Sequence, residues 1–182
     1  SNTGKVLVKI DIQNAKILMK KALDKGYKSA AIVLIHAWKH PKHEKILKKI
    51  AIELGFRNVC ISYDTAPLIG LNSRGDTTVV DAYLTPKLNR YTKNISLNIK
   101  NTKIFYIKSN GGLTSSKNFS GKDAVLSGPA GGVIAAVETN KLYKNYEGII
   151  GLDMGGTSTD VFHYKDHYER SYENIIAGNK IK

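Results

Sequence analysis

Residues 148–161 hold the side chains with the clearest chemical potential in this chain: Gly-Ile-Ile-Gly-Leu-Asp-Met-Gly-Gly-Thr-Ser-Thr-Asp-Val. An apolar run ends at the carboxylate of Asp153, and two glycines and two threonines follow it. Glycines allow backbone amides to approach an anion closely, and threonine hydroxyls add donors to phosphate oxygens. A carboxylate at a strand end is a hard oxygen ligand for Mg²⁺ or a metal-bound water. The segment therefore predicts a phosphate-binding loop with Asp153 beside the metal.

This loop differs from the P-loop, because no lysine follows the glycines and a second apolar run, residues 160–164, comes next. Two such runs around a glycine turn predict a hairpin with the loop at its tip. The alternative is a tight turn whose glycines serve geometry alone, with Asp153 and Asp160 capping backbone amides. Two aspartates, two glycines and two threonines together favour phosphate binding.

Two further glycine-rich motifs precede this loop: Lys-Ser-Asn-Gly-Gly-Leu at 108–113 and Leu-Ser-Gly-Pro-Ala-Gly-Gly-Val at 126–133. With residues 152–161 they resemble, in order and approximate spacing, three motifs of the hydantoinase A, 5-oxoprolinase and acetone carboxylase family. The resemblance covers Gly4 to Lys182, and weaker matches occur at Leu34-Ile35-His36, at Pro41 with His43-Glu44, and at Arg74 with Thr77-Thr78-Val79. Gly75-Asp76 departs from the small hydroxyl residues that the family more often has there.

The resemblance implies an α/β fold with parts of two ribonuclease-H-like lobes, as in actin/hexokinase-like ATPases, joined by a long helix. By the same resemblance, residues 4–100 would be the C-terminal part of the first lobe plus the connecting helix, while the small polar residues 1–3 are by their types typical of a tag remnant. Residues 101–182 would begin the second lobe. The family's first phosphate hairpin would then lie upstream of Gly4. We therefore expect an internal fragment that is inactive by itself.

The resemblance also implies residue roles in binding ATP and Mg²⁺. Asp153 would be catalytic and would lie near the metal and the γ-phosphate, while Asp160 would anchor the hairpin or the metal-bound water. Phosphate contacts are expected from Gly155, Gly156, Thr157, Ser158 and Thr159. Turns near the nucleotide or substrate, with a purely structural role as the alternative, are expected at Ser109, Asn110, Gly111, Gly112, Ser127, Gly128, Gly131 and Gly132.

Family chemistry would couple ATP hydrolysis to opening the C–N bond of a small cyclic amide, or to activating a carbonyl for carboxylation. A hydantoinase B-type partner subunit and an oligomeric full-length protein are further expectations. Two other classes stay open: a different actin- or sugar-kinase-like ATPase, and a noncatalytic basic binding module. The motif at 126–133 favours the hydantoinase-type enzyme.

Apolar spacing predicts the elements that position these motifs. The runs 30–35 and 58–62 are typical of buried parallel strands, and the stripes in 12–25 and 41–54 indicate helices between strands. Alternation at 6–10 suggests another strand. A long helix is predicted over 72–98, bent at Pro86. Strand 104–107, a turn at 110–112, helix 130–143 and strands 148–152 and 160–164 complete the pattern.

Composition excludes several classes. The formal net charge of +13 comes from 28 Lys and Arg against 15 Asp and Glu, but the lysines are spread over predicted helix faces, which argues against nucleic acid. No run approaches the roughly 20 apolar residues of a membrane span, so we expect a cytoplasmic protein without a membrane partner. The lone Cys60 is predicted to be buried in a strand. His36, His40, His43 and Glu44 match no common zinc spacing and are assigned to helix start and packing.

Overall fold

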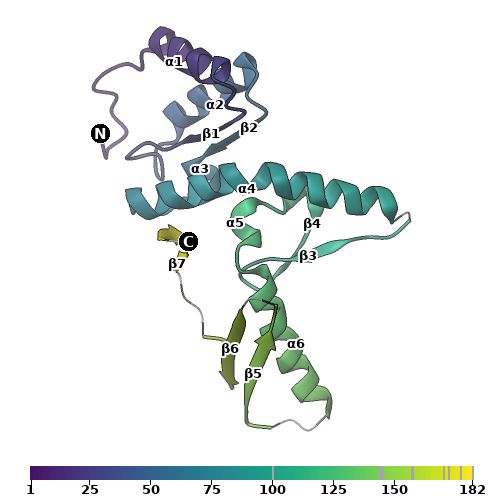
Figure 1. Ribbon diagram of the computed structural model, residues 1–182. Helices are drawn as coiled ribbons and strands as arrows, with labels where there is room; N and C mark the ends of the chain where they lie inside the picture. Colours follow the sequence, from purple (N-terminus) through teal and green to yellow (C-terminus); the bar gives the residue numbers. More distant parts are fainter. Residues whose placement is uncertain are drawn as a thin grey trace. The chain divides into compact units, whose positions relative to one another are not determined.

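The computed structural model shows a mixed α/β chain of short sheets and helices (Figure 1). It describes residues 1–99, 101–143, 146–156, 158–169, 171, 173–176 and 178–181. Contacts divide the chain into two compact units, the first of Ser1–Leu88 with Tyr172–Lys182 and the second of Asn89–Ser171. None of the described helices is both long and apolar enough to cross a bilayer.

The first unit is built on a parallel pair of strands, β1 (Ser29–Ile32) and β2 (Asn58–Ile61). Helix α2 (Lys42–Leu54) packs on both strands, and α1 (Ile12–Asp24) packs on α2. Asp11 caps α1 by accepting a hydrogen bond from the Asn14 amide at 2.9 Å. Gly55 ends α2 at a φ of 107°, a left-handed angle that favours glycine. The predicted alternation of strand and helix is confirmed for these elements.

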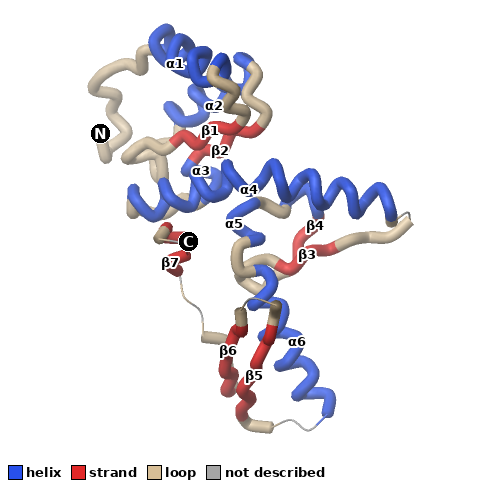
Figure 2. Tube along the Cα trace, viewed as in Figure 1, coloured by secondary structure: helices blue, strands red, loops and turns tan. Residues whose placement is uncertain are grey.

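Helix α4 (Leu71–Asn98) is the longest element and runs through Pro86 without interruption, as the tube in Figure 2 shows. It confirms the helix predicted over 72–98 to within one residue at its start. A short helix, α3 (Ser62–Thr65), precedes it. Proline is tolerated here although it removes one amide donor from the helix ladder.

The second unit contains two antiparallel hairpins and one long helix. Strands β3 (Phe105–Ile107) and β4 (Leu113–Ser115) form one hairpin, and β5 (Gly148–Met154) and β6 (Thr159–Lys165) form the other. A 3-10 turn (Ser116–Asn118) and α5 (Gly121–Ala124) lead to α6 (Ser127–Tyr143), which packs on β3, β5 and β6. The predicted hairpin around residues 153–160 is confirmed.

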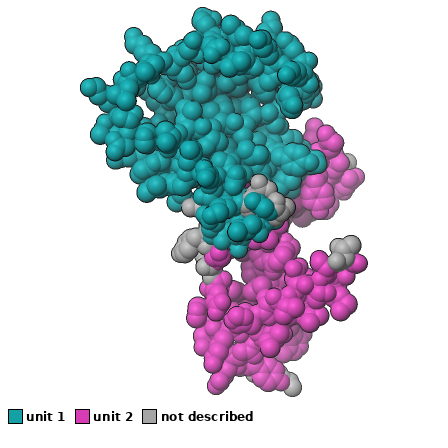
Figure 3. Space-filling model, turned by 60° about the vertical axis from the view of Figure 1, so that its left-hand side comes forward, with its two compact units in different colours: residues 1–88, 172–182 teal, residues 89–171 magenta. Residues whose placement is uncertain are grey.

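The last strands return to the first unit, whose atoms are teal in Figure 3. Strands β7 (Asn174–Ile176) and β8 (Asn179–Ile181) form a hairpin. The Lys180 amide donates to Oδ2 of Asp76 at 3.2 Å, and Oγ1 of Thr77 donates to the Lys180 carbonyl at 3.4 Å. These bonds tie residues about a hundred positions apart to the start of α4.

Two sequence expectations need correction. Residues 6–10 form no strand, and Val8 is 82% exposed; alternation alone makes no strand without a neighbouring strand to pair with. The strand predicted over 30–35 ends at Ile32. After Ile32 the backbone forms hydrogen bonds with side chains instead of with a neighbouring strand. The Leu34 amide donates to Glu44, and the carbonyls of Leu34 and Ile35 accept from Arg74.

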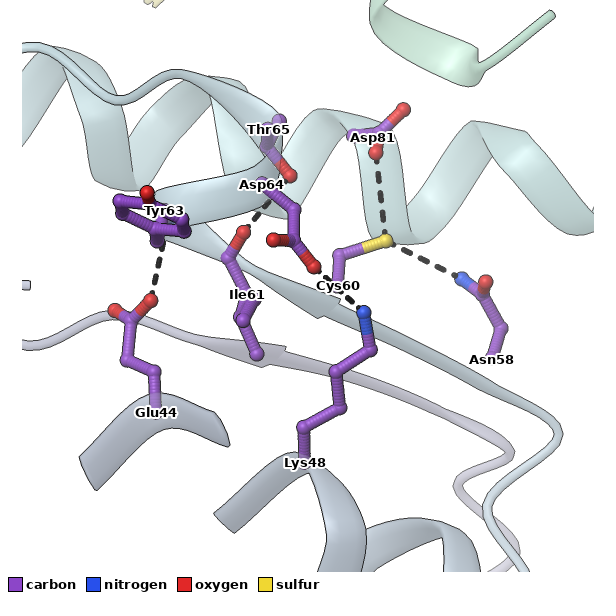
Figure 4. A network of polar contacts seen from close by, with 9 residues as sticks. All are labelled: Glu44, Lys48, Asn58, Cys60, Ile61, Tyr63, Asp64, Thr65 and Asp81. Atoms are coloured by element: carbon purple, nitrogen blue, oxygen red, sulfur yellow. Dashed lines mark hydrogen bonds and ion pairs between the residues drawn. The ribbon is translucent and has the colours of Figure 1, made fainter. Parts of the chain in front are cut away.

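A buried polar network fixes the loops that follow β1 and β2. Glu44 is fully buried, and its carboxylate accepts from Oγ of Ser62 at 2.6 Å. It also accepts from the Tyr63 amide at 2.9 Å (Figure 4). Arg74 is also fully buried and donates to Oγ of Ser62 at 2.9 Å and to the Leu68 carbonyl at 2.8 Å. Because both charged groups have several partners, their burial is compatible with a stable fold.

Candidate functional site

The predicted phosphate loop lies at the tip of the β5–β6 hairpin. The register places Asp153 opposite Asp160 and Met154 opposite Thr159. The Gly155 amide donates to the Ser158 carbonyl at 2.9 Å, which closes the turn. Thr157, the remaining predicted phosphate contact, lies outside the described residues. The two aspartates thus form the next-to-last pair of the ladder, one position before the turn, where both residues are exposed and can meet a ligand.

The first half of α6 lies beside this hairpin. A methyl group built on Gly132 would lie 3.6 Å from Oδ2 of Asp153, so the carboxylate stands in van der Waals range of the helix at a residue without a side chain. A methyl group on Gly131 would lie 3.4 Å from Cδ1 of Ile107, so this neighbouring glycine lies against β3. Residues 126–133 therefore bring the Asp153 carboxylate and the β3 strand to one helix.

The turn between β3 and β4 packs on the same helix. Oδ1 of Asn110 accepts from the Gly112 amide at 2.9 Å, and the Lys108 amide donates to the Gly112 carbonyl at 2.8 Å. Gly111 has a φ of 82°, and a methyl group there would lie 2.9 Å from Cδ1 of Ile134. Both constraints require glycine at this position. The structure therefore uses the Asn110-Gly111-Gly112 turn for packing.

The hydroxyls of Ser109 and Ser127 make hydrogen bonds within the protein. Oγ of Ser109 donates to the Asp123 carbonyl at 2.7 Å and accepts from the Leu126 amide at 3.0 Å. Oγ of Ser127 donates to the Ile107 carbonyl at 2.7 Å. These bonds fasten the start of α6 to β3, so both serines position the helix that carries Gly132. Gly128, another predicted contact, is exposed near the start of α6.

The hairpin depends on a residue that the sequence patterns did not single out. Gly151 pairs with Phe162 across the strands, and a methyl group on Gly151 would lie only 2.0 Å from Cζ of the ring. The aromatic ring thus occupies the space above the glycine. An isolated glycine inside a strand pattern is the signal that could have revealed this close approach.

The donor set at the loop suits a hard cation beside phosphate. Asp153 and Asp160 supply carboxylate oxygens from directly opposite positions, the type of ligand that Mg²⁺ prefers. Within the described ranges no group of three or more His, Cys, Asp and Glu side chains could hold a metal. Mg²⁺ commonly uses one or two carboxylates and completes its coordination with water and substrate phosphates, so the two aspartates fit that arrangement.

Comparison with known proteins decides the family. The hydantoinase/oxoprolinase profile matches residues 74–182, more than half of the chain, and the profile of the hydantoinase/oxoprolinase N-terminal region matches residues 1–55. The chain belongs to the hydantoinase/oxoprolinase family. The resemblance proposed from the three glycine motifs is thereby confirmed.

Relatives and solved structures agree with this family. The chain is 41% identical to 5-oxoprolinase 1 of Arabidopsis thaliana in an alignment of 182 positions. The alignment covers 98% of this chain and 14% of that relative. A nucleotide-free structure of acetone carboxylase, an enzyme of ATP-dependent acetone carboxylation, superposes with a TM-score of 0.77 at 25% identity, over 86% of this chain and 23% of the other. The ATP-dependent caprolactamase of Pseudomonas jessenii gives a TM-score of 0.74 at 27% identity, over 88% and 24%. The mixed α/β structure of this chain therefore resembles the corresponding parts of acetone carboxylase and caprolactamase.

Proposed function

We propose that this chain is part of an ATP-dependent enzyme that opens cyclic amides, and that the β5–β6 hairpin holds the phosphates of ATP. One observation carries the proposal: Asp153 and Asp160 are directly opposite each other one position before the ladder ends, and a glycine turn follows the last pair. Family membership supports it, and two relatives are named for cyclic amides, 5-oxoproline and caprolactam. The chain spans about 14% of the length of the matched 5-oxoprolinases of Arabidopsis thaliana and Saccharomyces cerevisiae, so the activity is that of a longer protein.

In this proposal Mg²⁺ offsets the negative charge of the phosphates when it is bound. Asp153 and Asp160 would hold it, directly or through water. A methyl group on Gly156 would meet no atom within 4 Å, so phosphate oxygens can approach the backbone there. Ser158 and Thr159 add exposed hydroxyl donors at the same turn. Preorganised donors of this kind stabilise the charge that develops during phosphoryl transfer.

The proposal extends to the finer architecture. Residues 4–100 would complete a first ribonuclease-H-like lobe with its connecting helix, and 101–182 would begin the second. A hydantoinase B-type partner subunit and an oligomeric full-length enzyme belong to the same proposal. A soluble, cytoplasmic enzyme is proposed as well.

The test replaces Asp153 by Asn in the complete enzyme. The substitution preserves shape and removes the charge that positions the metal, so kcat for ATP hydrolysis should fall by about 10² to 10³. Asp166→Asn is the matched control, because Asp166 is exposed in the turn after β6 at a φ of 62°, which Asn also tolerates. Thermal unfolding should be nearly unchanged in both variants. Near-normal turnover with saturable magnesium dependence in Asp153→Asn would require another phosphate site.

A carboxylase of the same family is the second candidate, supported by the likeness to acetone carboxylase. The two functions differ in what stimulates ADP release. A cyclic-amide hydrolase should release ADP on addition of 5-oxoproline or caprolactam, and a carboxylase only with a ketone and bicarbonate. Measuring ADP with each substrate in turn distinguishes them.

A further inference from the structure

The first unit contains a second candidate site that the phosphate chemistry does not use. A pocket of about 360 Å³ lies where the chain leaves β1, lined by Leu34, Ile35, His36 and Ala37 and by the residues that begin α2. In parallel α/β sheets ligands characteristically bind outside the carboxyl ends of the strands. Its volume is near the lower end of the range of about 300 to 1,000 Å³ typical of ligand pockets, which suits a small ring better than a nucleotide.

The polar side chains among the described lining residues are basic or can donate a hydrogen bond. They include His36, His43, Lys42 and Lys5, and among the described residues no Asp or Glu lines the pocket. Glu44, the nearest residue along α2, is fully buried and its carboxylate accepts from the amides of Leu34 and Tyr63. A larger hollow of about 610 Å³ between α6 and β5 has no charged residue among its described lining residues. The smaller pocket is therefore the one that suits an anion.

The three histidines divide into two kinds. His40 anchors the N-terminal segment, because its Nε2 lies 3.0 Å from the Asn2 carbonyl and a methyl group on Gly4 would lie 2.9 Å from its ring. His36 and His43 are half-buried, and in the described part of the chain their rings make no hydrogen bond or ion pair. An imidazole offers one N–H donor when neutral and two when protonated. Two half-buried rings in one pocket thus offer donors that a bound group can accept.

Hydrogen bonds from the buried Arg74 side chain and within the backbone hold the loop of residues 34–40, which carries His36. Nη2 of Arg74 donates to the Leu34 carbonyl at 2.7 Å and to the Ile35 carbonyl at 3.1 Å. The turn that follows is closed by the His40 amide, which donates to the His36 carbonyl at 2.9 Å. A site whose supporting backbone is fixed by buried bonds loses little freedom when a ligand binds.

We propose that this pocket binds the carboxylate-bearing cyclic amide itself: the imidazoles of His36 and His43 and the Lys42 ammonium hold the carboxylate, and the apolar wall from Leu34 to Ala37 contacts the ring. The assignment rests on the proposed function for its choice of substrate class. It predicts that a lactam with a carboxylate binds much better than the same ring without one, because the neutral ring leaves the donors unpaired.

Histidine ring NMR signals of the 182-residue chain, titrated with 5-oxoproline and with 2-pyrrolidone, test the proposal. We expect saturable shifts of the His36 and His43 signals with 5-oxoproline and at least about tenfold weaker binding of 2-pyrrolidone, equivalent to about 1.4 kcal/mol. His36→Gln, His43→Gln and Lys42→Gln should each weaken 5-oxoproline binding by about five- to tenfold, without lowering the melting temperature. His163→Gln is the control, because His163 is exposed on β6 in the other unit.

Equal binding of the two lactams would overturn the carboxylate assignment, and no saturable shift by about 20 mM, far above a 1 mM dissociation constant, would overturn the site. The same titration in Asp153→Asn separates this inference from the proposed function. Binding there should persist, since none of the described residues that line the pocket comes from the β5–β6 hairpin. If Asp153→Asn loses ATPase activity as expected but the wild-type chain binds no lactam, the pocket is rejected and the proposed function stands.

Discussion

At the scale of single residues, Cys60 is kept in its neutral form by its surroundings. Its Sγ is buried and donates to Oδ2 of Asp81 at 3.4 Å (Figure 4). Burial raises the pKa of Cys60 to about 12, and the neighbouring Asp81 carboxylate adds to the effect. The thiolate is the reactive form of cysteine, so this thiol is no nucleophile at neutral pH. The predicted structural role is confirmed.

The pKa shift of Cys60 makes stability depend on pH. The unfolded thiol ionises near pH 9.0 and the folded one near 12. The neutral thiol therefore contributes its full stabilisation to the folded state below pH 9.0. As pH rises from 9.0 towards 12, this part of the free energy of unfolding is lost, by up to about 1.4 kcal/mol per pH unit. Urea unfolding of the wild type and of Cys60→Ala between pH 7 and 10.5 measures this. The two free-energy curves should converge above pH 9, and parallel curves would contradict the prediction.

Arg74 gives a second prediction at this scale. Burial lowers its pKa and Glu44 opposes the shift, and the guanidinium donates to Ser62, Leu68 and Leu34. Arg74→Met would leave these acceptors unpaired and the Glu44 charge uncompensated, so urea unfolding should show a loss of about 3 to 5 kcal/mol. Arg90→Met, at an exposed position of the same helix, should change stability by less than about 0.5 kcal/mol. Equal losses in both variants would mean that the hydrogen bonds of Arg74 add no more to the free energy of unfolding than an exposed arginine does.

At the scale of elements, the β5–β6 hairpin depends on the fit of Phe162 over Gly151. Gly→Ala in a strand normally stabilises by about 0.4 to 1 kcal/mol, because it restricts the unfolded chain. Here the added methyl group would overlap the ring, so Gly151→Ala should instead destabilise by about 1 to 3 kcal/mol. A loss of stability in Gly151→Ala, in place of the usual gain, would therefore show that the Phe162 ring packs against Gly151.

A double-mutant cycle with Phe162→Ala measures this coupling. Once the ring is removed, Gly151→Ala should cost little or become stabilising, which gives an interaction energy of about 1 kcal/mol or more. Thermal unfolding of the four chains supplies the values. Strict additivity would show that the ring moves aside freely.

Sequence patterns predicted the elements with long or self-contained signals. The apolar spacing from Val80 to Ile95 located α4, and two apolar runs around Gly155-Gly156 located the β5–β6 hairpin. Three-residue strands such as β4 and β7 carry too little periodicity to stand out. The polar network of Glu44 and Arg74 was also missed, because polar residues are usually exposed and their burial depends on partners far away in sequence.

The same limit applies to the candidate site. The types and order of residues 153–160 predicted a phosphate loop, since that chemistry is local. The engagement of the Ser109 and Ser127 hydroxyls with the backbone of Asp123 and Ile107 is a tertiary property. Spacing alone could not distinguish a serine that contacts a ligand from one that positions a helix. The lining of the pocket beyond β1 likewise brings residues 1–8 against the start of α2.

At the scale of the whole molecule, the groups that we propose to hold phosphate, at the turn of the β5–β6 hairpin, face solvent. Asp153, Gly156, Ser158 and Asp160 are all exposed. Electrostatic stabilisation of phosphoryl transfer requires donors on several sides of the phosphate in a site that excludes water. The matched 5-oxoprolinases of Arabidopsis thaliana and Saccharomyces cerevisiae are about seven times longer than this chain, so most of their residues have no counterpart here.

We therefore expect the 182-residue chain by itself to release ADP from Mg²⁺-ATP no faster than the uncatalysed background. Exposed charges act in a high-dielectric medium, where each contact with phosphate is worth far less than in a closed site. A coupled ADP assay on the purified chain measures this, with Asp153→Asn as the reference for contaminating activity. The two proteins should give the same rate with and without 5-oxoproline. A magnesium-dependent rate that Asp153→Asn abolishes would show instead that this single hairpin suffices for catalysis.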